Sequence, residues 1–335
     1  MTRYSLLTPL LFAQLALGFQ SKEAPEAVKP PQVISKPEPK YTEEARTALV
    51  EGIVVLQIVV DEQGRATNIE VLSPLGYGLD ESAIATVAQW RFQPGTKNGK
   101  PVKVLAQVEV TFRLGTNVYN EKLEKQRTSF NLALHAVQQK KVTPGTIKSL
   151  SDLTSQKYAP GIYLYGKVLE EGLGAPANAE QGFRLIEESA DRKYGPAMYE
   201  VALARIKGDR IEKDPTKGID MMQSAAKFGS RAAQIYLGNA YETGDSVAVD
   251  SGKARQYYRL CAASGEGACQ YRLGKSLLDS GHPDRDYVQA IAWLMLASDQ
   301  KIEDAEKILE QEDQRMTPAQ VASANRLKAQ LVHRQ

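Results

Sequence analysis

Three stretches in the first third of the chain carry the hydrophobic pattern of β-strands. Residues 53–60 and 66–72 are apolar and rich in β-branched side chains, and a glycine-containing turn at 61–64 joins them. Residues 102–112 alternate between apolar and polar side chains, with Leu105 as the one apolar exception on the polar face. A period of two places one face of a strand in a core and the other in water. The pattern therefore predicts a β-hairpin and a later strand with one buried face.

Two helical segments interrupt these strands. A short helix follows Thr42, which is its capping residue, and a second helix with one apolar face spans about 79–90. A short strand and a turn at Asn98 and Gly99 lead into the last strand. The order helix, hairpin, helix, strand predicts a small αββαβ domain over residues 39–115.

From about residue 159 to 302 the pattern becomes helical and repeats every 36 residues. Small residues form two columns, at Gly166, Ala202, Gly238 and Gly274, and at Ala190, Ala226, Ala262 and Ser298. A glycine column contains Gly172, Gly208, Gly244 and, one place late, Gly281. An Asn/Asp column contains Asn178, Asp214, Asp250 and Asp286. Self-similarity at a fixed spacing is the signature of a repeat architecture.

Each repeat unit has the features of a helix hairpin. The glycine suits the left-handed position that closes a first helix, and the Asn or Asp side chain caps the second. Small residues let neighbouring hairpins approach closely and bury a continuous core. The chain is therefore predicted to be a two-module α+β protein, in which an all-α solenoid of helix hairpins follows the small domain. The solenoid consists of four repeats over 159–302, an N-terminal helical cap over 116–158 and capping helices over 303–335.

The first 38 residues have a different composition. Residues 1–18 combine Arg3, an apolar run and small residues near position 18, which predicts a signal peptide for export. An uncleaved membrane anchor is the alternative, although the apolar run is shorter than the roughly 20 residues that span a bilayer. Residues 19–38 are polar and proline-rich, which predicts an extended linker.

The small domain resembles the C-terminal domain of the TonB energy-transducer family. The resemblance rests on "EGIVVLQIVVDEQGRA", "LDESAIATVAQWRFQP" and the closing "VEVTF". It implies that a short extended peptide of an outer-membrane or periplasmic protein binds by adding a strand to an exposed sheet edge. The expected edge residues are Val102, Val104, Ala106, Val108, Val110 and Phe112. Trp90 is weighed as an additional contact, but a large aromatic residue in so small a domain more often fills the core.

The repeats resemble the Sel-like repeat, a tetratricopeptide-like class named after the suppressor/enhancer-of-lin proteins. The third copy, "YLGNAYETG" with "DSGKARQYYRLCAASGEGAC", carries this resemblance best. It implies a scaffold that binds a second protein in the solenoid groove. Exported cysteine-rich members of this class carry bridges at the spacing of Cys261 and Cys269, so the resemblance also implies a disulfide. Two small residues at packing positions are the alternative.

The charge balance and the absence of known motifs exclude several classes of function from the prediction. The net charge of +2 comes from 42 basic and 40 acidic side chains, and no long basic run indicates nucleic-acid binding. The sequence shows no spacing of histidines and cysteines typical of a metal site, no phosphate-binding glycine loop and no hydrolase motif. No catalytic residue, metal or cofactor is therefore predicted.

These observations predict an exported, periplasmic or secreted protein–protein interaction adaptor without enzymatic activity. Two alternatives stay open. One is a membrane-anchored TonB-type energy transducer for outer-membrane transport, in which the N-terminal segment is retained. The other is an enzyme acting on cell-wall peptides, of the cysteine-rich Sel-like type.

Overall fold

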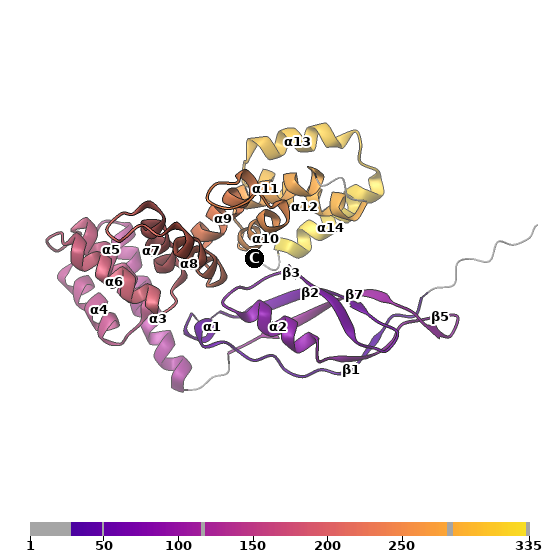
Figure 1. Ribbon diagram of the computed structural model, residues 1–335, viewed down its shortest axis with the longest axis horizontal. Helices are drawn as coiled ribbons and strands as arrows, with labels where there is room; N and C mark the ends of the chain where they lie inside the picture. Colours follow the sequence, from indigo (N-terminus) through magenta and orange to yellow (C-terminus); the bar gives the residue numbers. More distant parts are fainter. Residues whose placement is uncertain (1–27, 49, 115–117, 280–283, 333–335) are drawn as a thin grey trace, which may run out of the picture.

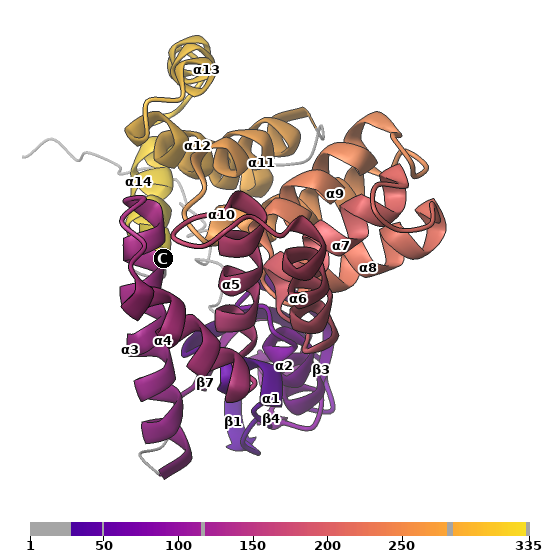
Figure 2. The ribbon, with the colours of Figure 1, turned by 90° about the vertical axis from the view of Figure 1, so that its left-hand side faces the viewer.

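The computed structural model of the chain describes residues 28–48, 50–114, 118–279 and 284–332. A strand-rich domain comes first along the chain, and the helices that follow form a row along one side of it (Figure 1). Seen from the side, most of these helices lie above the strands, and the first of them extends down to the level of the strands (Figure 2). The α+β, two-module architecture expected from the sequence pattern is confirmed.

The first module contains two helices and seven strands within the described residues. They are β1 (Gln32–Ser35), α1 (Glu43–Thr47), β2 (Gly52–Val60), β3 (Ala66–Ser73), α2 (Leu79–Val87), β4 (Arg91–Gln93), β5 (Thr96–Lys97), β6 (Lys100–Pro101) and β7 (Val104–Phe112).

The core of this module lies on one face of an antiparallel sheet with the strand order β3–β2–β7. The inward-facing side chains of β2 are fully buried, namely Val54, Leu56, Ile58 and Val60. They pack with apolar residues of α2, including Leu79 and Val87. Burial of each such side chain contributes about 1.5–3 kcal/mol. On β7 the alternation places Val110 and Phe112 in the same core and leaves Leu105 53% exposed.

The predicted linker segment carries an element that its composition does not indicate. Within 19–38, β1 pairs antiparallel with β4, so that Val33 lies opposite Phe92. Residues 1–18, the expected signal segment, lie outside the described residues.

The second module consists of helices throughout its described residues. Two helices lead the row, α3 (Val118–Gln138) and α4 (Pro144–Ser155). The repeats comprise α5 (Ala159–Glu171), α6 (Ala179–Asp191), α7 (Gly195–Lys207), α8 (Pro215–Lys227), α9 (Arg231–Thr243), α10 (Ser251–Ala263), α11 (Gly267–Asp279) and α12 (Asp284–Asp299). Two helices follow the repeats, α13 (Glu303–Asp313) and α14 (Pro318–Val332).

The repeat columns have the local roles expected of them. Asn178, Asp214 and Asp250 each cap the second helix of a hairpin by accepting the amide N–H three residues later. The cap oxygens are 2.9 to 3.0 Å from those nitrogens. The glycine column closes the first helices in the left-handed conformation, for example at Gly208 with φ of 75°. Of the fourth-copy members, Gly281 lies outside the described residues.

The small-residue columns mark the places where paired helices come closest. A Cβ atom on Gly238 of α9 would lie 2.4 Å from the ring of Tyr258 on α10. A Cβ atom on Gly166 of α5 would lie 2.7 Å from the carbonyl oxygen of Gly182 on α6. A side chain at Gly166 or Gly238 would force the paired helix to shift, so glycine at these two positions serves helix packing.

The end of the row is closed as the sequence predicts. Thr317 and Gln320 form a capping box at the start of α14, with the Thr317 N–H donating to Gln320 Oε1 at 2.9 Å. Lys328 of α14 forms an ion pair with Asp299 of α12 at 2.6 Å. Helix α14 thereby covers the outer face of the last repeat.

A disulfide joins Cys261 of α10 to Cys269 of α11, with Cα atoms 5.9 Å apart. Both cysteines are buried in the core that runs through the repeats. The bridge links the second helix of the third repeat to the first helix of the fourth. It therefore ties together two neighbouring repeats.

Reduction of this disulfide is expected to lower the free energy of unfolding by about 2.5 kcal/mol, because it reopens a short loop in the unfolded chain. Urea unfolding with and without a reductant measures the effect. A variant with both Cys261→Ala and Cys269→Ala should lose the sensitivity to reductant. Recovery of the two cysteines as free thiols in a non-reducing peptide map would contradict the prediction.

Candidate functional site

Strand β7 is an outer strand of the sheet. It pairs with β2 over its whole length, from Val104 opposite Val60 to Phe112 opposite Gly52, without a register shift. Among the described residues no strand pairs with its other side. Such a side presents backbone donors and acceptors that another extended chain can pair with. The structure thus places an open edge where the sequence predicts one.

The predicted edge residues fall on β7 with one exception. Val104, Ala106, Val108, Val110 and Phe112 lie within the strand. Val102 precedes it, and its amide N–H donates to the carbonyl oxygen of Gly95 at 2.9 Å. The turn around Asn98 and Gly99, both with positive φ, brings these two residues together. The available edge therefore begins two residues later than the alternation suggests.

Trp90 lies in the core of the first module. Its side chain is 2% exposed and packs beside Phe92, with ring centroids 6.1 Å apart. Its indole N–H donates to the carbonyl oxygen of Pro37 at 3.4 Å, and Lys36 Nζ lies 5.1 Å from the ring centroid. The chain segment that enters the domain therefore covers Trp90, and the tryptophan does not line the β7 edge.

The loop between β3 and α2 contacts the solenoid. The amide N–H of Tyr77 donates to the carbonyl oxygen of Lys227 at 2.8 Å, at the turn between α8 and α9. In the same turn Gly229 has φ of 78°, and a Cβ atom there would lie 2.5 Å from the Tyr77 ring. Thr42 Oγ1 donates to the carbonyl oxygen of Tyr77 at 2.7 Å, which ties the loop to α1. The turn and the loop are therefore closely fitted.

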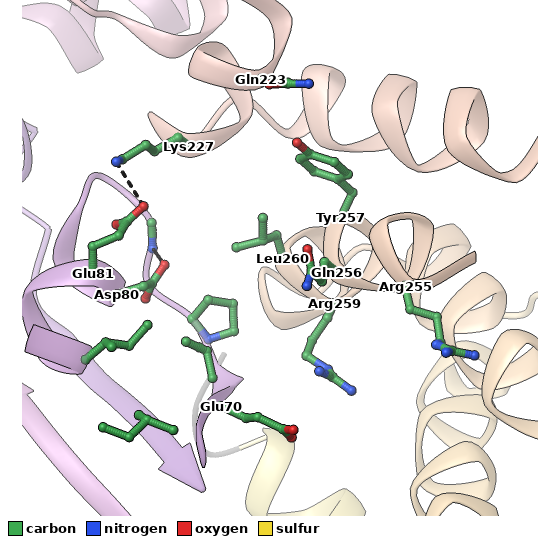
Figure 3. Close-up of a pocket in the computed structure, with 16 residues that line it drawn as sticks. Glu70, Asp80, Glu81, Gln223, Lys227, Arg255, Gln256, Tyr257, Arg259 and Leu260 are labelled. Atoms are coloured by element: carbon green, nitrogen blue, oxygen red, sulfur yellow. Dashed lines mark hydrogen bonds and ion pairs between the residues drawn. The ribbon is translucent and has the colours of Figure 1, made fainter. Parts of the chain in front are cut away.

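Two ion pairs flank this contact. Lys227 Nζ lies 2.9 Å from Glu81 Oε1, as Figure 3 shows, and Lys193 Nζ lies 2.6 Å from Glu44 Oε1. The lysines are about half exposed, and such surface pairs contribute about 0–1 kcal/mol each. These ion pairs therefore add little free energy to the contact, and their main effect is on the relative orientation of the two modules.

The residues that surround Tyr77 belong to a column that the sequence reasoning did not use. Tyr158 and Tyr194 begin α5 and α7 at equivalent positions, and neither makes a side-chain capping bond. Burial raises the pKa of Tyr158 to about 12 and also raises the pKa of Tyr194. At the next equivalent position Ser230 caps α9 through Ala233 N–H. A tyrosine at the N-cap position makes no capping hydrogen bond with its side chain. Its presence there indicates in the sequence that the start of the helix contacts another part of the protein.

Asp80 organises the loop between β3 and α2, residues 74–78, which we call the docking loop. Its two carboxylate oxygens accept the amide N–H groups of Leu75, at 2.7 Å, and Gly76, at 2.9 Å. Burial raises the pKa of Asp80 to about 6, and the neighbouring Glu81 adds to the shift. The two amide groups and Lys227 oppose it. Burial prevails, so this carboxylate is ionised in the folded protein only at a cost.

In the part of the chain that the structure describes, no group of three or more His, Cys, Asp or Glu side chains could hold a metal ion. Within the same residues, no helix has both the length and the apolar character needed to cross a bilayer.

Two protein families match the chain. The family described as Gram-negative bacterial TonB protein C-terminal matches residues 37–114. The Sel1 repeat family matches four consecutive segments, 159–194, 195–229, 231–266 and 267–301.

Individual proteins resemble one module or the other. A TonB protein of Vibrio cholerae is 34% identical over 87 residues, which are 26% of this chain and 36% of that protein. The human protein sel-1 homolog 2 is 28% identical over 173 residues, which are 48% of this chain and 24% of that protein. A crystal structure of a Sel1 repeat protein from Oxalobacter formigenes covers 63% of this chain and 88% of its own, with 20% identity and a TM-score of 0.47. The chain thus spans about a third of the length of the TonB relative and about a quarter of the sel-1 relative.

Gly229→Ala is expected to loosen the contact between the modules, because the added Cβ meets the Tyr77 ring in a close-packed site. Overpacking of this kind costs about 1–3 kcal/mol. Gly265→Ala is the matched control, since Gly265 occupies the equivalent turn one repeat later with φ of 85°. Small-angle X-ray scattering should show a larger radius of gyration for Gly229→Ala alone. Equal compactness of the two variants would contradict the assignment.

The free energy of unfolding is expected to fall as the pH rises from about 4 to about 6, by an amount on the order of 2–3 kcal/mol from Asp80. The folded pKa lies above the unfolded value of 3.8, so the unfolded chain releases this proton first. Urea unfolding across this range measures the slope. Asp80→Asn should flatten it, and Asp152→Asn, at an exposed position of α4, should leave it unchanged. An unchanged slope in Asp80→Asn would refute the role of this carboxyl.

Proposed function

We propose that this chain, which carries a TonB C-terminal domain fused to four Sel1 repeats, is a protein–protein interaction adaptor without enzymatic activity. In this proposal the β7 edge binds an extended peptide by strand addition, and the solenoid binds a further protein. The observation that carries the proposal is that β7 is an outer strand, with which no strand of the described residues pairs on the side away from β2. Both modules belong to families of interaction modules, which supports the same assignment.

Strand β7 suits strand addition for two reasons. Its pairing with β2 is regular over nine residues, so a peptide on the other side meets an evenly spaced row of donors and acceptors. Leu105 is 53% exposed and offers an apolar contact to one side chain of the peptide. Alternate side chains of an added strand lie on the same face, which gives the peptide sequence a way to be recognised. The proposed ligand is a segment of an outer-membrane or periplasmic protein, and the proposed location is the periplasm.

The inner side of the solenoid supports the second half of the proposal. A cavity of about 650 Å³ lies between the docking loop and the first helices of the repeats. Tyr163 and Tyr199 line it, and the Tyr163 hydroxyl donates to Glu200 Oε1 at 2.6 Å. Because the chain's own domain already covers part of this side, the further protein would bind to the part that stays uncovered.

Strand addition is tested by disulfide trapping. Leu105→Cys should crosslink to synthetic peptides taken from the N-terminal segments of outer-membrane transporters, each with one cysteine moved along the sequence. Crosslinking is expected at alternate peptide positions, because every second side chain of an added strand lies on the same face. The yield should be roughly tenfold above that of Leu132→Cys, an equally apolar exposed position on α3. Equal yields at all peptide positions, or at both cysteines, would argue against an added strand.

A further inference from the structure

A cleft lies between the first module and the solenoid, and it runs from α2 and β3 to the outer face of the sheet. It consists of two cavities of about 680 and 350 Å³. Arg259 of α10 lines both of them, so they are neighbours. We call the two together the inter-module cleft. Its size falls in the range of sites that hold small ligands or short peptides.

The wall on the sheet side is polar. Gln57 in the middle of β2 lies opposite Glu70 of β3 and Gln107 of β7, so the three side chains share one face. Glu70 lines the larger cavity and Gln107 the smaller one, whereas Gln57 lines neither. Glu70 is exposed, and it has no ion-pair partner among the described residues.

Gln57 carries an unusual feature. Its side-chain oxygen Oε1 is buried and has no hydrogen-bond partner within the described part of the chain. A buried acceptor without a donor costs about 1–3 kcal/mol. Because this oxygen is buried, it lies behind the wall and does not itself contact a ligand. The exposed Glu70 carboxylate on the same face of the sheet favours a basic side chain in the cleft.

The opposite wall is cationic. Arg255 and Arg259 are one turn apart on α10 and therefore lie on the same side of that helix. Figure 3 shows them across the larger cavity from Asp80 and Glu81. Arg255 is half-buried, and in the described structure it makes no ion pair. Its guanidinium group is suited to bind a carboxylate.

The two walls differ in charge and come from different modules, yet Glu70 and Arg255 do not pair with each other. Where two packed surfaces exist only to hold each other, opposite charges at the contact usually meet. Here the separation leaves room between them, with Ile69, Tyr257 and Leu260 as apolar contacts. A chain that carries both charges and spans the gap satisfies both walls at once.

We propose that the inter-module cleft binds a short extended peptide segment of a partner protein, which places a basic side chain against Glu70 and an acidic side chain against Arg255. This site is separate from the β7 edge, since strand addition uses the backbone of β7 whereas Glu70 and Arg255 belong to β3 and α10. Both modules contribute to it, so neither module alone holds the complete site.

A positional-scanning library of acetylated and amidated tetrapeptides, built on alanine, tests the proposal on the full chain. The protein should enrich peptides that combine Lys or Arg with Asp or Glu. Calorimetry with the best tetrapeptide then gives the affinity. Glu70→Gln should remove the preference for the basic residue and Arg255→Gln the preference for the acidic one. Each should weaken binding roughly tenfold, as the loss of one charge-assisted hydrogen bond predicts.

Matched controls are Glu62→Gln in the turn before β3 and Arg184→Gln on α6, both exposed and outside the cleft. These variants should bind as the wild type does, and circular dichroism should confirm helicity in all four. A saturating concentration of a transporter peptide should leave tetrapeptide binding unchanged, which separates this site from strand addition at β7. The proposal is overturned if no tetrapeptide binds saturably, if only one charge is selected, or if both cleft variants bind like the wild type.

Discussion

The fit between the β3–α2 loop and the turn after α8 determines how the rest of the structure is arranged. Tyr77 meets this turn through one backbone hydrogen bond and through a ring contact that only glycine permits at position 229. Because the loop follows β3 directly, this contact brings β3 close to α10. The inter-module cleft results from that contact, whereas the outer position of β7 follows from the strand order of the described sheet.

Much of the fold could be predicted because its determinants are local. A capping Asp, a left-handed glycine and a small residue at a helix crossing each act within a few residues, and their repetition at a fixed spacing makes them visible. The alternation along β7 is local in the same sense. The hairpin of β2 and β3 follows from its apolar runs and its turn.

The parts that sequence reasoning missed depend on contacts between distant segments. The pairing of β1 with β4 joins a proline-rich segment to a strand nearly 60 residues away, and no local pattern announces it. The docking of Tyr77 and the orphaned oxygen of Gln57 are likewise visible only in three dimensions. Position 102 shows a further limit. The alternation of apolar and polar residues extends to Val102, but the amide N–H of this residue donates to the carbonyl oxygen of Gly95 and not to a neighbouring strand of the sheet. Among these, only the tyrosines at positions 158 and 194 left a trace in the sequence.

The spacing of the repeats has a further consequence for how such a chain can evolve. The turn that contacts Tyr77 follows α8, whereas the helices beside the far part of the sheet are α10, α12 and α14. Deleting one hairpin from the second half would leave every remaining hairpin intact but move α12 and α14 away from the sheet. The number of hairpins is thus matched to the width of the sheet, and it can change only by one whole hairpin at a time.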